Sequence, residues 1–161
     1  MAALENPPES LCFGCGPHHP RGLHLTFERR TAADGVDEVV CEYTPKADEI
    51  GWPGLMHIGL LFMVLMETSY WAALTLGGRV MTVTGPVTFE FTRLPRVGLL
   101  FVCRARFGTE AGKPPSVTCL AQTATGKAVA RMSSSWHRES RAAVQRAGIA
   151  LPSYLLEDMD P

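Results

Sequence analysis

The chain has 161 residues, a formal net charge of −1 and 19% charged residues, a composition that suits one domain with a sizeable buried core. Its basic residues occur in short groups and are balanced by acids, which excludes the basic surface that nucleic-acid-binding proteins commonly carry. No nucleic-acid partner is therefore expected.

The N-terminal residues 1–21 are predicted to form a loose leader rich in glycine and proline, which favour turns. Residues 1–11 are acidic and contain prolines without an apolar core, so no signal peptide is predicted. The chain has five cysteines, an odd number, and three of them fall within strand-like runs: Cys41, Cys103 and Cys119. This usage favours a reduced, cytoplasmic protein over a disulfide framework.

Within the leader, Cys12-x-x-Cys15 is followed by His18 and His19, a spacing that suggests zinc because thiolate and imidazole groups are zinc ligands. All four side chains would come from one short loop, and no second pair of such residues follows elsewhere in the sequence. We expect no metal here, although the sequence leaves the alternative open.

Two strands are expected after the leader. In residues 22–30 apolar and polar side chains alternate, the period-2 pattern of a strand with one face exposed to water. Residues 33–35 (Ala-Asp-Gly) predict a turn, and residues 36–44 predict a second strand paired with the first. Residues 45–55 are predicted to be a loop.

Residues 56–77, MHIGLLFMVLMETSYWAALTLG, form the longest apolar run. The run is long enough to span a bilayer, but it contains His57 and Glu67, and strand-like segments flank it on both sides. We therefore predict a central helix within a sheet-containing domain and no membrane association. Apolar residues occur on every face of this helix, which predicts burial on all sides. The pair Gly77-Gly78 predicts a left-handed end to the helix.

Four further strands are expected, separated by turn-forming residues, which is typical of an antiparallel meander. They are residues 79–93 with a bend at Gly85-Pro86, residues 99–107, residues 116–123 and residues 128–137. Residues 139–161 predict a short helix at 140–147 and a loose tail. The prediction is a single α+β domain, residues 1–161. Its core at residues 22–138 is an antiparallel sheet of about six strands wrapped around one long helix.

Three stretches carry a family resemblance. Residues 12–23, CFGCGPHHPRGL, are similar to the Cys-x-x-Cys-Gly…Pro-x-Gly-Leu segment of some hot-dog proteins. Residues 53–59, PGLMHIG, are similar to the loop and His-Gly-Gly that begin the central helix of that fold. Residues 91–98, FTRLPRVG, are similar to the aromatic, Arg, Pro and Gly residues that end the next strand. Over roughly residues 12–137 the chain resembles the PaaI-like acyl-CoA thioesterases of the hot-dog superfamily.

The resemblance implies hydrolysis of an acyl-CoA or acyl-carrier thioester at the interface of a homodimer or a dimer of dimers. It implies that the amides of Ile58 and Gly59 hold the carbonyl oxygen, because unsatisfied N–H groups at a helix N-terminus stabilise developing negative charge. Glu67 would act as base or nucleophile, and Thr84 on the next strand would orient water. No cofactor and no metal are implied.

The other implied contacts are made to the substrate. His57 and Met66 would touch the bound acyl-CoA, and Arg93 and Arg96 would bind its phosphates.

The chain departs from the family pattern near the implied site. Ile58 replaces the middle Gly of His-Gly-Gly, and Gly51 replaces an Asn or Gln six residues before His57. Met66 stands where the family has its carboxylate, and Glu67 follows one residue later, a rotation of about 100° on a helix.

These departures leave two alternatives to hydrolysis open. A hot-dog module could hold an acyl-CoA or another small apolar ligand without turnover. Glu67 itself has a structural alternative, in which it is a buried carboxylate hydrogen-bonded to a Thr or Ser hydroxyl or a backbone N–H, or an ion-pair partner across the dimer. A dehydratase of 3-hydroxyacyl thioesters would also use a His and an acid, but the spacing to Glu67 is longer than in the usual dehydratase helix.

Overall fold

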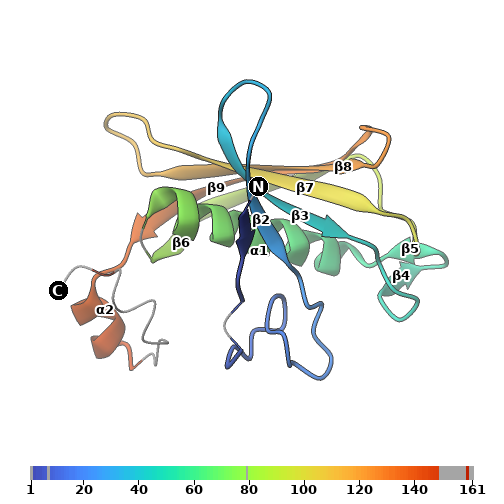
Figure 1. Cartoon of the computed structure of the whole chain (residues 1–161), viewed down its shortest axis with the longest axis horizontal. Helices are drawn as coiled ribbons and strands as arrows, with labels where there is room; N and C mark the ends of the chain where they lie inside the picture. The colour runs from blue at the N-terminus through green and yellow to red at the C-terminus, as the bar shows by residue number, and fades with distance from the viewer. Residues whose placement is uncertain (1, 7, 79, 149–158, 160–161) are drawn as a thin grey trace.

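The computed structural model describes residues 2–6, 8–78, 80–148 and 159, without the side chains of Met81 and Thr84. An antiparallel sheet of seven strands lies on one side of a long helix, in the order β1-β2-β3-β7-β8-β9-β6 (Figure 1). The strands are β1 Ala2–Leu4, β2 Phe27–Thr31, β3 Asp37–Tyr43, β6 Met81–Phe91, β7 Phe101–Gly108, β8 Ser116–Thr123 and β9 Ala128–Arg138. A separate hairpin joins β4 Ile50–Trp52 to β5 Leu55–Met56, and the helices are α1 Ile58–Gly77 and α2 Arg141–Arg146.

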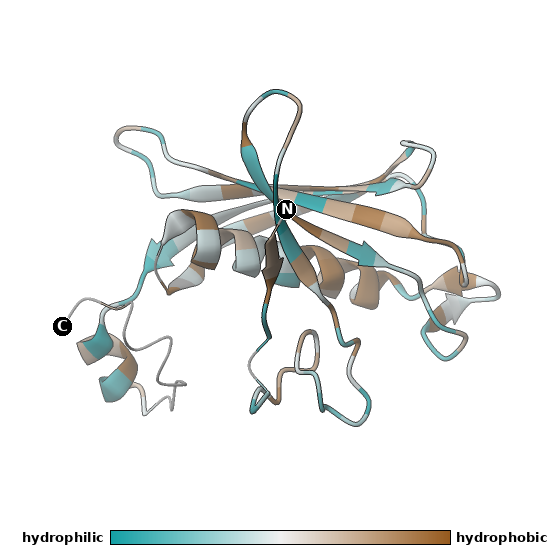
Figure 2. Ribbon diagram, in the orientation of Figure 1, coloured by the Kyte–Doolittle hydropathy of each residue, from teal (hydrophilic) through white to brown (hydrophobic). Residues whose placement is uncertain are grey.

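The core lies between the sheet and α1. Alternate residues of β3 and β7 are buried in one cluster with α1: Val39, Cys41, Tyr43, Phe101, Cys103 and Ala105. On the helix the buried residues include Leu61, Val64 and Leu65, and Figure 2 shows hydrophobic residues along much of α1. The buried hydroxyls of Thr68 and Ser69 donate to the carbonyls of the preceding turn, at 2.6 and 2.8 Å. Both buried hydroxyl groups therefore have hydrogen-bond partners within the core.

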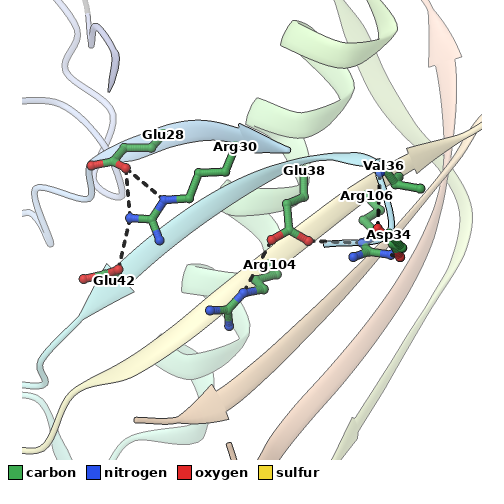
Figure 3. A network of polar contacts seen from close by, with 8 residues as sticks. All are labelled: Glu28, Arg30, Asp34, Val36, Glu38, Glu42, Arg104 and Arg106. Carbon is green, nitrogen blue, oxygen red and sulfur yellow. Dashed lines mark hydrogen bonds and ion pairs between the residues drawn. The ribbon is translucent and has the colours of Figure 1, made fainter. Parts of the chain in front are cut away.

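The other face of the sheet is held by ion pairs that cross β2, β3 and β7 (Figure 3). Glu38 is only 5% exposed and lies between Arg104, at 3.5 Å, and Arg106, at 3.1 Å. Arg30 pairs with one acid of β2 and one of β3. Because a buried carboxylate is costly unless paired, these contacts account for the burial of Glu38.

Several predictions about the elements are confirmed. The two strands after the leader pair as β2 and β3, and β8 has the predicted bounds. The register of β6 against β9 shifts between Thr84 and Thr88, which is the predicted bend at Gly85-Pro86. Gly78 ends α1 with a left-handed φ of 69°. The α+β class with one long helix against an antiparallel sheet is the observed fold.

Other local predictions are wrong, and each has a physical cause. β1 pairs with β2, so the leader is not loose throughout. Residues 22–26 do not join the sheet, because the N–H groups of Leu23 and Leu25 donate to leader carbonyls at 2.9 Å. The positive φ of His24, 53°, also interrupts an extended strand there. Residues 45–55, predicted as a loop, include β4 and the start of β5.

The last strands do not form one continuous meander, because β6 lies beside β9 at the edge of the sheet and not beside β7. Within one protomer α1 is not enclosed on all sides, since Phe62, Met63 and Met66 are only partly buried. By length and composition α1 could cross a membrane. It lies against the sheet with eight residues buried, and is the core helix that the sequence predicts.

Candidate functional site

The N-terminus of α1 is fixed by His57, which has extended backbone angles and caps the helix. Its Nδ1 accepts a hydrogen bond from the Gly59 N–H at 3.0 Å, and its own N–H donates to the Glu49 carbonyl at 2.8 Å. Two amides are expected to hold an oxyanion, and one of them, the Gly59 N–H, is already hydrogen-bonded to the His57 side chain. The Ile58 N–H has no hydrogen-bond partner among the described residues. It is the amide at this end of α1 that is available to a ligand.

A cavity of about 370 Å³ opens beside this amide. It is lined by Gly51, Trp52, Met56, His57, Ile58, Phe91 and Leu94. A Cβ atom at Gly51 would lie 3.0 Å from the Cα of His57, closer than ordinary van der Waals contact. A larger side chain at this position would therefore require the cap residue to move.

A second cavity, of about 670 Å³, adjoins the first, and Leu94 lines both. Three cationic side chains, those of Arg93, Arg96 and Lys127, contribute to its wall. None of the three forms an ion pair with a carboxylate in the part of the chain that the structure describes. The segment carrying both arginines is held near α1 because Met56 donates to the Pro95 carbonyl at 2.9 Å. The result is a cationic cleft next to the helix N-terminus.

Sequence reasoning missed Lys127. It follows the turn Thr125-Gly126, and its basic character was visible in the sequence. Its position beside Arg93 and Arg96 depends on the hairpin between β8 and β9, which places this turn next to the segment after β6. No local pattern in the sequence predicts that approach.

Glu67 lies on the flank of α1 that faces the leader and β2. Its Oε1 is 3.4 Å from the Sγ of Cys12, in a hydrogen bond. One turn later Trp71 stacks on Phe27 of β2, with ring centroids 5.1 Å apart. A Cβ atom at Gly14 would lie 2.5 Å from the Cγ of Glu67, so any larger residue there would displace the Glu67 side chain from this position. Burial, followed by the negative charge of Cys12, raises the pKa of Glu67 to about 7.

Glu67 is distant from the amides at the start of its own helix. It follows Gly59 by eight residues, which corresponds to about 12 Å along the axis and about 80° of rotation. Met66 is rotated by only about 20° from Gly59, so it lies nearly in line with the helix opening. The structure therefore brings together His57, Ile58 and Gly59, with the arginines nearby, and leaves Glu67 apart from them within one protomer.

Two other residues expected at the site are Thr84 and Met66. Thr84 pairs with Ser135 in the sheet, but its side chain lies outside the described part of the structure. Met66 is partly buried against the core cluster.

The suggested zinc ligands do not come together as a set of four. Cys12 and Cys15 lie with Glu67, and the ligand atoms of these three residues are within 4.8 Å of one another. The His19 Nδ1 instead accepts from the Arg21 N–H at 3.2 Å, and His18 is exposed. Of the described residues, neither histidine belongs to the group that could hold a metal.

Comparison with known proteins bears on the fold. No family model matches the sequence, and no curated protein matches it. Among solved structures, Escherichia coli PaaI, from the phenylacetic acid degradation operon, is 18% identical with a TM-score of 0.58, covering 64% of this chain and 73% of that one. A thioesterase superfamily protein is 17% identical with a TM-score of 0.65, covering 76% of this chain and 61% of that one.

A hypothetical thioesterase of Streptococcus pneumoniae, solved with coenzyme A, is 13% identical with a TM-score of 0.59. That match covers 70% of this chain and 85% of the streptococcal chain. Likeness at these identities is a statement about fold. Together with the antiparallel sheet packed on α1, it shows that the chain has the hot-dog fold, which it shares with these neighbours.

Proposed function

We propose that this protein binds an acyl-CoA or acyl-carrier thioester and hydrolyses it. The observation that carries the proposal is the Ile58 N–H, which has no partner among the described residues and lies at the cavity beside the cationic cleft. A free amide at a helix N-terminus stabilises the oxyanion that forms when a thioester carbonyl is attacked. The thioester would sit at Ile58.

The cationic cleft supports a ligand of the coenzyme A type. Arg93, Arg96 and Lys127 offer positive charge for phosphate groups, and most of the remaining lining is apolar. The Streptococcus pneumoniae neighbour was solved with coenzyme A, and a Streptococcus mutans neighbour with acetyl-CoA. We extend that ligand class to this chain.

Hydrolysis also requires a group that activates water. Glu67 is the carboxylate on α1, and a pKa of about 7 suits a general base near neutral pH. Because Glu67 is about 12 Å along the helix from Gly59, it would have to serve the helix N-terminus of a second protomer. A homodimer or a dimer of dimers is thus part of this proposal.

A second candidate function is ligand binding without turnover. It is favoured by the position of Glu67, which faces Cys12 on the β2 flank while Met66 lies in line with the helix opening. In that case the Ile58 amide and the cleft hold the thioester, and no base is present near it.

Release of free thiol from short, long and aromatic acyl-CoAs separates the two candidates. A thioesterase releases coenzyme A with saturation kinetics for at least one acyl class. A binding module shows saturable affinity, measured by calorimetry, and no thiol above the uncatalysed rate. Absence of both turnover and binding for every class would contradict both candidates.

The cleft is tested by Arg93→Ala and Arg96→Ala. If both arginines bind phosphate, each variant raises the KM for acyl-CoA about tenfold with kcat unchanged, because the lost contact is the same in ground and transition states. The KM for an acyl-pantetheine thioester without the nucleotide stays as in the wild type. Lys113→Ala, in an exposed turn paired with Glu110, is the matched control. Equal effects on both substrates would contradict phosphate binding in the cleft.

A further inference from the structure

The leader residues 12–15, here called the dithiol loop, are fixed in place against α1. Gly16 donates to the Cys12 carbonyl at 2.8 Å, and the N–H groups of Leu23 and Leu25 donate to the loop carbonyls at 2.9 Å. A Cβ atom at Gly16 would lie 2.5 Å from a backbone oxygen, so the turn requires glycine there. The backbone thus presents two thiols to one carboxylate.

The two thiols have different surroundings. Cys12 is half-buried, whereas Cys15 is 7% exposed. The two sulfur atoms and a carboxylate oxygen of Glu67 all lie within 4.8 Å of one another. The adjacent Cys15 thiol is the largest of the influences that lower the pKa of Cys12 to about 5. The pKa of Cys15 is raised far above its usual value, first by the adjacent Cys12 and second by burial.

Glu67 completes the group. Its Oε1 lies 3.4 Å from the Cys12 sulfur, and its carboxylate is within 4.8 Å of the Cys15 sulfur. Exchange of a dithiol with a disulfide uses an accessible thiolate and a second thiol that resolves the mixed disulfide. Here Cys12 and Cys15 supply these two groups, and the Glu67 carboxylate lies within reach of the proton of Cys15.

We propose that Cys12 and Cys15 form a redox-active dithiol that exchanges with low-molecular-weight disulfides, with Glu67 accepting the proton of Cys15. The Cys12 thiolate attacks a disulfide RSSR, which forms Cys12–S–S–R and releases RS⁻. Glu67 takes the proton of Cys15, and the resulting thiolate attacks the Cys12 sulfur. This closes the Cys12–Cys15 disulfide and releases a second RS⁻, which the proton on Glu67 can neutralise. The dithiol loses two electrons and the external disulfide gains them.

A zinc site fits the same residues less well. Structural zinc takes four protein ligands, and the group in the described part of the chain offers three. The nearby ring of His24 is engaged with the Gly16 carbonyl at 3.0 Å, and that of His19 with a backbone N–H. Exchange with a disulfide uses a more accessible attacking sulfur and a second, resolving one, and the unequal burial of Cys12 and Cys15 matches these two roles.

The test uses the full chain in glutathione buffers of increasing oxidised fraction, followed by acid quenching, alkylation and peptide mass analysis. We expect a Cys12–Cys15 disulfide to form before any change at the three strand cysteines, which are fully buried and serve as internal controls: Cys41, Cys103 and Cys119. Cys15→Ser should accumulate glutathione on Cys12, because the resolving thiol is absent. Cys12→Ser should leave Cys15 unmodified.

The role of Glu67 is measured separately. In Glu67→Gln, ring closure after the mixed disulfide forms should be at least about tenfold slower, while alkylation of Cys12 stays fast. These readouts involve no acyl-CoA, so they stand or fall independently of the proposed hydrolysis.

Three outcomes would overturn the proposal. The first is oxidation of Cys12 and Cys15 no faster than that of the strand cysteines. The second is a Cys15→Ser protein without a glutathione adduct on Cys12. The third is a purified wild-type chain that retains about one zinc ion with both thiols protected from alkylation. Ring closure in Glu67→Gln at the wild-type rate would remove Glu67 from the step.

Discussion

At the scale of single residues, Glu67 shows how the environment sets the chemistry of a carboxyl group. Burial disfavours its ionised form, and the adjacent Cys12 thiolate adds like charge. Both effects raise the pKa of Glu67 to about 7, so the group changes protonation state near neutral pH. A carboxylate that titrates in this range can take up and release protons under physiological conditions, which is what both proposals about this residue use.

The proposed hydrolysis therefore has an expected pH dependence. A general base acts in its ionised form, so kcat/KM for an acyl-CoA should rise as the pH increases through about 7 and level off above it. Glu67→Gln should lower kcat about 100-fold or more and remove this rise, while acyl-CoA affinity stays within about twofold. Glu110→Gln, at an exposed turn, is the control. Near-normal turnover in Glu67→Gln would exclude Glu67 as the base.

At the scale of elements, the residues at the start of α1 both stabilise the helix and form the candidate site. His57 caps the helix by accepting from Gly59, which leaves the preceding amide, that of Ile58, at the cavity. The cap is itself held because the His57 N–H bonds to the carbonyl of Glu49. One histidine therefore determines both where α1 begins and which amide remains available to a ligand.

Removal of the cap should have a measurable cost. His57→Ala leaves the Gly59 N–H without its side-chain acceptor, and the free energy of unfolding in urea should fall by about 1 kcal/mol. His18→Ala, at an exposed leader position, should change it by less than about 0.5 kcal/mol. Equal stability of the two variants would show that the histidine cap does not stabilise α1.

At the scale of the whole molecule, the free edge of the sheet and one side of α1 are incompletely covered. β6 ends the sheet beside β9, and no described strand pairs with its outer edge. Phe62 of α1 packs against Phe89 of β6, and Phe91 at the end of the strand remains 50% exposed. An exposed aromatic ring beside an unpaired strand edge is typical of a surface that another chain covers. This supports the homodimer in the proposed function.

A charge placed on this surface should therefore weaken self-association. Phe91→Asp should raise the dimer dissociation constant at least about tenfold in sedimentation equilibrium, because the dimer would bury an unpaired carboxylate. Val36→Asp, at an exposed residue in the turn between β2 and β3, should leave the constant unchanged. A wild-type protein that stays monomeric at all concentrations would contradict the dimer.

The candidate site could be predicted only in part. The motif around His57 located the helix start and the Ile58 amide, and the pattern around Arg93 and Arg96 located one wall of the cleft. Lys127 and the contact between Glu67 and Cys12 had no local signal, because each depends on segments far apart in the chain. The pairing of β1 with β2 had no sequence signal either. β1 is only three residues long, and it forms a strand because the edge of β2 is free to pair with it.

The sequence by itself determined the α+β class, the central helix and most of the strands, because apolar periodicity and glycine positions act over a few residues. Only the tertiary structure decided which flank of α1 carries Glu67, what faces it, and which strand ends the sheet. The reason is physical: a helix rotation of about 100° per residue, or a change of strand neighbour, alters no local pattern yet redirects every side chain it affects.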